Sequence, residues 1–155
     1  MASDHITTLE YANAIWHPAY KRQMKAIENV QRRATKIIPE IRDLTYADRL
    51  RHLNLPSIQY RQLRGDLIQT YKIVHDIDNV TKLDFFHANP STKTRKSYLK
   101  LEKEYARSTA RCNFLSNRVK NYWNDLSFEA KSAKDVNTFK NYIDKELSSL
   151  RGCHV

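Results

Sequence analysis

Apolar residues recur along most of the chain at intervals of three and four positions, which is the spacing of one face of an α-helix. The pattern is clearest over residues 22–38, where apolar positions share one face and basic residues occupy the opposite face. Pro18 and Pro39 mark the ends of the first two helices, because proline breaks a helix interior. The predicted helices cover about residues 9–20, 22–38, 45–52 and 57–75, a stretch from about 113, and 135–150.

Helix starts are marked by residues that cap N-termini. Thr45 followed by Asp48 indicates a capping box, and Ser57 is the expected N-cap of the fourth helix. Large residues lie on the apolar stripes, so we expect both tryptophans, Phe114 and most tyrosines to be core residues. The stripes consist of Leu9, Ala12, Ile15 and Trp16; Met24, Ile27, Val30, Ala34, Ile37 and Ile38; Tyr60, Leu63, Leu67, Tyr71 and Val74; Leu115, Val119, Tyr122 and Trp123; and Val136, Phe139, Tyr142, Ile143, Leu147 and Leu150.

Residues 97–112 depart from the helical period. Leu99 and Leu101 alternate with Tyr98, Lys100 and Glu102, which is the two-residue period of a strand. The predicted fold is therefore mainly α, with four to six helices and one small β-hairpin around residues 97–112. The predicted segments are a tail (1–8), a helical region (9–75), an acidic connecting loop with a Phe85-Phe86 anchor (76–95), a hairpin with two C-terminal helices (96–150) and a second tail (151–155).

Positive charge is concentrated in two blocks. The chain carries a net charge of +10, and its pI is about 9.7. Residues 20–72 hold twelve Lys and Arg against five Asp and Glu, and residues 93–120 hold nine against two, so each block carries +7. Such a surplus favours a polyanionic partner, either nucleic acid or an acidic membrane surface, and a merely basic soluble protein is the alternative.

The basic residues in these blocks are the candidate phosphate contacts. Six of them lie on the face of the 22–38 helix opposite its apolar stripe, with only Glu28 at the edge. Tyr98 and Tyr105 lie in the second block, where their rings could stack on unpaired bases. A solvated helix surface is the alternative interpretation. The candidates are Lys21, Arg22, Lys25, Arg32, Arg33, Lys36, Arg61, Arg64, Arg107, Arg111, Arg118 and Lys120.

Motifs for catalysis or metal binding are missing. The His residues are scattered and no two Cys residues lie close together, so we expect no metal site and no cofactor. Tyr46-Ala47-Asp48-Arg49 resembles the Tyr-x-Asp-Asp string of reverse transcriptases, but Arg49 stands where a metal-binding carboxylate is needed. Cys112 is expected to be a buried or semi-buried structural thiol. We therefore expect a protein without enzymatic activity, located in the cytoplasm or nucleus, with no membrane or small-molecule partner.

An ordered series of short motifs resembles LINE-type (non-LTR) retrotransposon reverse transcriptases. Leu9-Glu10-Tyr11-Ala12 and Trp16-His17-Pro18 are similar to the family's L-E-Y-A-x-x-x-W-x-P segment. Ile27-Glu28-Asn29-Val30-Gln31-Arg32-Arg33-Ala34-Thr35-Lys36 is similar to its I-E-x-V-Q-R-R-A-T-K segment. The later matches are Leu55-Pro56-Ser57, Arg64-Gly65-Asp66-Leu67-Ile68, Thr70-Tyr71-Lys72-Ile73, Arg107-Ser108, Asn113-Phe114, Ser116-Asn117-Arg118-Val119, Trp123-Asn124 and Val136-Asn137.

The resemblance covers about residues 9–149 and implies the thumb and downstream region of the polymerase, as a truncated stand-alone chain. In that family this region follows the palm and grips the template–primer duplex. No catalytic aspartate is carried over, because the matching region contains none. Residues 1–8 depart from the family pattern, as does Leu126-Ser127-Phe128, where the family usually has Leu-Pro.

The expected partner is RNA or an RNA–DNA hybrid, bound without sequence specificity, together with the missing polymerase palm. Two alternatives stay open. One is a pseudogene-like structural fragment with no surviving activity. The other is a basic adaptor that binds acidic proteins.

Overall fold

The computed structural model describes residues 17–18, 20–87, 99–102 and 104–148. This part of the chain is mainly helical and contains no strand. The predicted first helix, with Trp16, lies largely outside the described residues. The elements are α2 (Lys21–Lys36), the 3-10 helix η1 (Pro39–Ile41), α3 (Tyr46–His52), α4 (Ile58–Val74), α5 (Lys82–Phe85), α6 (Thr109–Asn113), α7 (Leu115–Arg118), α8 (Lys120–Asp125), α9 (Phe128–Lys131) and α10 (Val136–Glu146).

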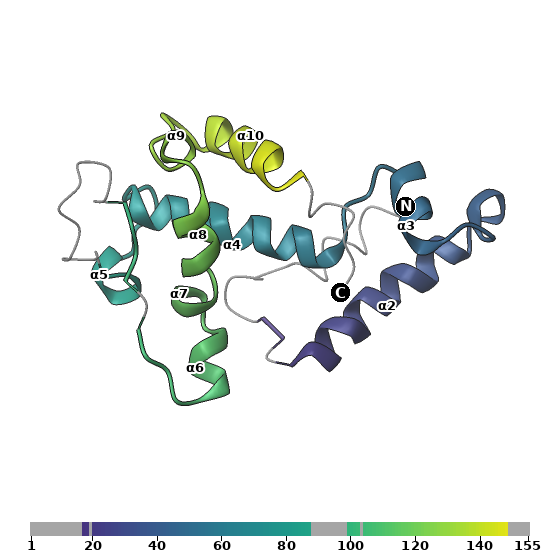
Figure 1. Ribbon diagram of the computed structural model, residues 1–155, viewed down its shortest axis with the longest axis horizontal. Helices are drawn as coiled ribbons and strands as arrows, with labels where there is room; N and C mark the ends of the chain where they lie inside the picture. The colour runs from purple at the N-terminus through teal and green to yellow at the C-terminus, as the bar shows by residue number, and fades with distance from the viewer. Residues whose placement is uncertain (1–16, 19, 88–98, 103, 149–155) are drawn as a thin grey trace.

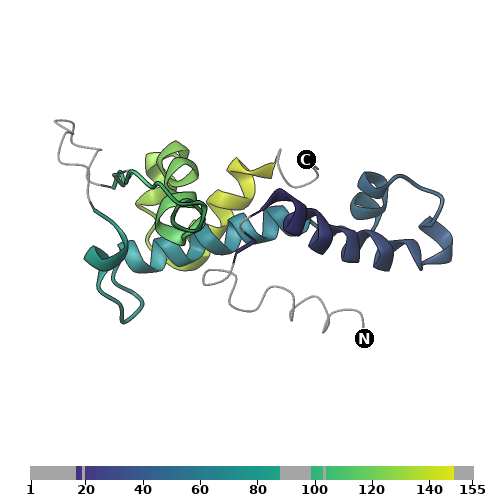
Figure 2. The ribbon, with the colours of Figure 1, turned by 90° about the horizontal axis from the view of Figure 1, so that it is seen from below.

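The long helix α4 is the centre of the molecule (Figure 1). Helices α2 and α3 lie toward its N-terminal end, whereas α5 to α9 lie beside its middle and C-terminal half, which gives an elongated shape (Figure 2). Helix α10 runs along α4, so that Asp144 reaches Tyr60 and Arg64 in the N-terminal half of α4. Ser57 caps α4 as predicted, because its hydroxyl accepts a hydrogen bond from the Tyr60 N–H. Thr45 caps α3 in the same way through the Asp48 N–H. Both helix starts are thus confirmed.

The main hydrophobic core lies between α4 and the C-terminal helices. Tyr71 of α4 stacks on Phe139 of α10 with ring centroids 4.3 Å apart, and its hydroxyl donates to the Ala133 carbonyl at 2.7 Å. Trp123 of α8 packs against the same Phe139 and is fully buried, as predicted. Phe86 of the predicted loop anchor is also fully buried. The core therefore joins the helical region predicted for residues 9–75 to the region predicted for residues 96–150.

A buried ion pair joins α4 to α7. Arg118 donates from Nε and Nη2 to the two carboxylate oxygens of Asp66, at 2.8 and 2.7 Å. The Asp66 side chain is 4 % exposed and that of Arg118 is 10 % exposed. A third bond, from Nη1 to the Asn113 carbonyl at 2.7 Å, ties the end of α6 to the pair. Such a pair fixes geometry, because neither charge can be left alone in a low-dielectric site.

Helix α2 packs on α3 and α4 through polar groups. Gln31 and Thr35 are its buried residues. Gln31 accepts from Arg61 at 2.6 Å and donates to the Pro56 carbonyl at 3.2 Å, and the Glu28 carboxylate accepts from the Ile58 N–H at 3.1 Å. The apolar stripe predicted for this helix is only partly buried: Met24, Ile27 and Ile38 are half-buried, whereas Val30 and Ala34 are exposed and Ile37 is 80 % exposed.

The predicted β-hairpin around residues 97–112 is wrong. The predicted alternation is present, because Leu99 and Leu101 are buried and Lys100 and Glu102 are exposed. The backbone carbonyls of the two leucines, however, accept hydrogen bonds from side chains of α8, and the next residue, Glu102, donates from its N–H to the His87 carbonyl at 2.9 Å. Trp123 Nε1 donates to the Leu99 carbonyl at 2.8 Å. The Asn124 amide exchanges two hydrogen bonds with the Leu101 backbone, both at 3.0 Å.

The other half of the predicted hairpin is helical, because Ser108 caps α6 by accepting from the Arg111 N–H. The helix predicted from residue 113 is broken at Phe114, whose backbone is extended (φ −64°, ψ 145°). The described residues therefore contain more and shorter helices than the four to six predicted. Phe114 is 40 % exposed, so its assignment to the core is wrong. Tyr122 and Tyr142 are also exposed.

We predict that Arg118→Leu lowers the free energy of unfolding by about 3–5 kcal/mol, because Asp66 is then left charged and buried without its partner. Urea unfolding followed by circular dichroism measures this loss. Replacing Asp66 by Leu in the same chain should recover part of it, since no uncompensated charge remains.

Arg64→Leu is the matched control. It removes a bidentate pair with Asp144 at 2.6 and 2.9 Å whose side chains are partly exposed. Water screens such a pair, so the expected loss is below about 1 kcal/mol. Equal losses for Arg118→Leu and Arg64→Leu would contradict the structural role of the buried pair.

Candidate nucleic-acid interface

The basic face of α2 is exposed along the length of the helix. All six candidate cations on this helix are exposed. None of them forms an ion pair with another residue that the structure describes. An unneutralised row of cations produces a positive potential that attracts polyanions. The row consists of Lys21, Arg22, Lys25, Arg32, Arg33 and Lys36.

Tyr46 of α3 helps to position this row. The guanidinium carbon of Arg32 lies 4.7 Å from the centroid of the Tyr46 ring, a cation–π distance. The Tyr46 hydroxyl donates to the Glu28 carboxylate at 2.5 Å. Burial raises the pKa of Tyr46, and the hydrogen bond to Glu28 adds to the effect. Sequence reasoning missed Tyr46, because the pattern along a single helix carries no sign of a contact with the next one.

Arg49 is a buried cation on the inner side of α2. It donates to the Leu44 carbonyl at 2.7 Å, to the Thr35 hydroxyl at 3.2 Å and to the Arg32 carbonyl at 3.4 Å. The last turn of a helix carries partial negative charge, which favours a cation at this position. Arg49, which stands where the Tyr-x-Asp-Asp string has its second aspartate, therefore holds α3 against the end of α2.

Two further candidates, Arg61 and Arg64, lie on α4 and serve internal contacts. Arg61 is half-buried and donates to Gln31. Arg64 binds Asp144 of α10, and this hydrogen bond raises the pKa of the Arg64 guanidinium. Both side chains hold helices together, which reduces their availability for phosphate.

The structure separates the four candidates of the second basic block. Arg107 and Arg111 are exposed. Arg118 is engaged in the buried pair with Asp66, and Lys120 is 0 % exposed. Of the four cations in the predicted second patch, two are therefore exposed. Tyr105 is exposed beside them, whereas Tyr98 lies outside the described residues.

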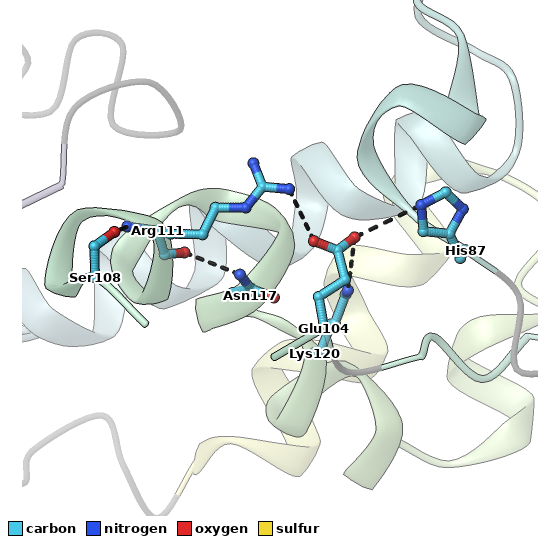
Figure 3. A network of polar contacts seen from close by, with 6 residues as sticks. All are labelled: His87, Glu104, Ser108, Arg111, Asn117 and Lys120. Atoms are coloured by element: carbon cyan, nitrogen blue, oxygen red, sulfur yellow. Dashed lines mark hydrogen bonds and ion pairs between the residues drawn. The ribbon is translucent and has the colours of Figure 1, made fainter. Parts of the chain in front are cut away.

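Glu104 neutralises the cations around it (Figure 3). Its carboxylate accepts from Arg111 at 2.8 Å and lies 3.7 Å from both Lys120 Nζ and His87 Nε2. The hydrogen bond from Arg111 lowers the pKa of Glu104, and the charges of Lys120 and His87 act in the same direction. Burial lowers the pKa of Lys120. Glu104 is thus the counter-ion that a buried ammonium group requires.

The remaining chemistry is sparse in the described part of the chain. Cys112 is exposed, which contradicts the expected buried or semi-buried thiol. No group of three His, Cys, Asp or Glu residues is placed to hold a metal ion among the residues that the structure covers. Of the helices in those residues, none combines the length and apolar character that crossing a membrane requires.

The chain has no significant match among protein-family models, curated proteins or solved structures. The resemblance to LINE-type reverse transcriptases therefore stays a prediction that depends on the motif series alone.

We predict that Glu104→Gln destabilises the protein at neutral pH and has less effect as the pH falls. The folded state lowers the pKa of Glu104, so its ionised form stabilises the fold above the unfolded-state pKa of about 4.3. This contribution is lost on acidification, because the wild-type carboxyl then becomes neutral as well. Urea unfolding of both proteins between about pH 3 and 7 measures the difference.

Glu129→Gln is the control, since Glu129 is exposed on α9 and forms no ion pair within the described residues. A difference between wild type and Glu104→Gln that stays constant with pH would show that the charge of Glu104 is not what stabilises the fold.

Proposed function

We propose that this protein binds nucleic acid without sequence specificity and that the basic face of α2 is its principal contact surface. The observation that supports this most directly is the row of six exposed cations described above. Lys and Arg bind phosphate by displacing condensed counterions, which provides affinity but no sequence information. The proposed partner is RNA or an RNA–DNA hybrid.

The dimensions of α2 suit such a contact. A helix of 16 residues is about 24 Å long, which is enough to reach several successive phosphates of one strand. The polar contacts of Glu28, Gln31 and Thr35, on the face next to the basic row, hold the helix in a defined position. The cations are thereby presented on a packed element of the fold, which limits the entropy lost on binding.

The motif resemblance adds to this proposal. In LINE-type reverse transcriptases the corresponding region holds the template–primer duplex, and we propose a non-catalytic remnant of such a polymerase that keeps this holding role. Arg107 and Arg111 form a smaller second cationic group; Arg111 is paired with Glu104, so Arg107 is the cation of this group that would contact the same partner.

A second candidate function rests on the exposed apolar residues of α2. Val30, Ala34 and Ile37 are exposed beside the basic face, although their spacing marks them as a packing surface. In the proposed parent polymerase this strip would pack on the palm. A fragment that retains only this structural role would bind another polypeptide in place of nucleic acid.

The proposal predicts a specific loss in the double variant Arg33→Gln with Lys36→Gln. Each lost phosphate contact lowers the slope of log Kd against log salt by roughly 0.7–0.9, so the double variant should lower it by roughly 1.5. Affinity at low salt should fall about tenfold or more. Fluorescence anisotropy with an RNA–DNA hybrid across a salt series measures both quantities.

The matched control is Lys134→Gln with Lys145→Gln, which removes the same charge from exposed positions near and on α10. If the two double variants weaken binding equally, net charge and not the α2 face explains the affinity. No binding of the wild type at low salt would refute the proposed function.

A further inference from the structure

A pocket of about 500 Å³ lies at the second cationic group, away from α2. One wall is the segment from Glu104 to Ala106, and the other is formed by residues of α6, α7 and α8. This volume is in the range of pockets that hold small organic groups. The residues of the second wall are Cys112, Asn117, Arg118 and Asn121.

The charged residues of the pocket are already neutralised. Arg118 is paired with Asp66, and Glu104 with Arg111. The interior therefore has no spare charge for a phosphate or a cation. Arg107, by contrast, is exposed, forms no ion pair with another described residue and lies near the pocket in sequence, so its guanidinium can bind an anion outside the pocket. A neutralised pocket next to an exposed cation suits a ligand whose neutral part enters the pocket and whose phosphate remains outside it.

The uncharged residues indicate what that neutral group is. Tyr105 lines the pocket with 87 % of its surface exposed, so the ring contributes little to the core and is available for stacking. Asn117 and Asn121 provide amide groups, which combine donors and acceptors as the edge of a nucleobase does. Aromatic rings that stack on bases next to cations that bind the backbone are typical of single-strand binding sites.

Asn117 provides an independent observation. Its Nδ2 donates to the Arg111 carbonyl at 2.9 Å, which fixes the side chain (Figure 3). Its Oδ1 is buried and has no hydrogen-bond partner among the described residues. Buried acceptors without a partner are uncommon in folded proteins, and each one needs an explanation such as a ligand or an ordered water.

We propose that this pocket receives one unpaired base of a single-stranded nucleic acid, with Tyr105 stacking on the base and Arg107 contacting the adjacent phosphate. The proposal rests on the proposed function, because it assumes that the chain binds nucleic acid. It adds a preference for strands with unpaired bases, which the α2 face alone would not provide. The base is read weakly, since every base has a face for stacking.

The test compares three labelled ligands by fluorescence anisotropy: a single strand of about 12 nucleotides, an abasic strand of the same length, and a blunt duplex. The abasic strand keeps the phosphates and removes the bases. The wild type should bind the strand with bases about tenfold more tightly than the abasic strand, which is the size of one stacking contact.

Tyr105→Ala should remove this tenfold preference and leave duplex binding unchanged, whereas Tyr105→Phe should retain the preference. Tyr122→Ala is the matched control, because Tyr122 is exposed on α8 and does not line the pocket. Urea unfolding of each variant shows whether the fold is intact, and the high exposure of Tyr105 predicts an unchanged midpoint.

The outcomes separate the two proposals. If all three ligands bind with a salt-dependent affinity but bases make no difference, the pocket proposal fails and the α2 proposal stands. If Tyr105→Ala behaves as the wild type, the pocket proposal also fails. If no ligand binds at low salt, both fail. Displacement of the strand by micromolar nucleoside monophosphate would identify a free nucleotide as the occupant and overturn the assignment to a strand.

Discussion

The bidentate ion pair between Asp66 and Arg118 is the contact on which the arrangement of the C-terminal helices depends. It places α7 against the middle of α4, and the bond from Arg118 to the Asn113 carbonyl adds the end of α6. The α8 residue Trp123 then reaches both Phe139 and the Leu99 carbonyl. Two opposite charges that cannot be separated without a large desolvation cost thus fix the position of several short helices that have little stability of their own.

The basic residues of the chain serve two different purposes. Arg49, Arg64, Arg118 and Lys120 are bound to carbonyls or carboxylates inside the fold or between helices. The cations on α2 have no acidic partner among the described residues. The net charge of +10 does not show how the charge is distributed, whereas the structure shows six exposed cations concentrated on one helix. This concentration, more than the total, supports the proposed binding of nucleic acid.

The two proposed contacts complement each other physically. Phosphate contacts along α2 would provide salt-dependent affinity for any strand, paired or not. A base stacked on Tyr105 would add affinity for strands with unpaired bases. This part of the affinity would depend little on salt concentration, because stacking involves no counterion release. The exposed apolar strip at Val30 and Ile37 is explained by neither contact. It is the feature that most favours a further polypeptide partner.

The sequence by itself determined the helical class, the starts of α3 and α4 at Thr45 and Ser57, and the buried position of Trp123. These follow from local rules, since a cap or a stripe depends on residues within a few positions. Only the tertiary structure decided which candidate cations are exposed, because the partners of Arg118 and Lys120 lie 52 and 16 positions away in sequence. It also decided that the alternating Leu99 and Leu101 pair with side chains of α8, since a two-residue period shows that a segment is extended and half-buried but not what covers it.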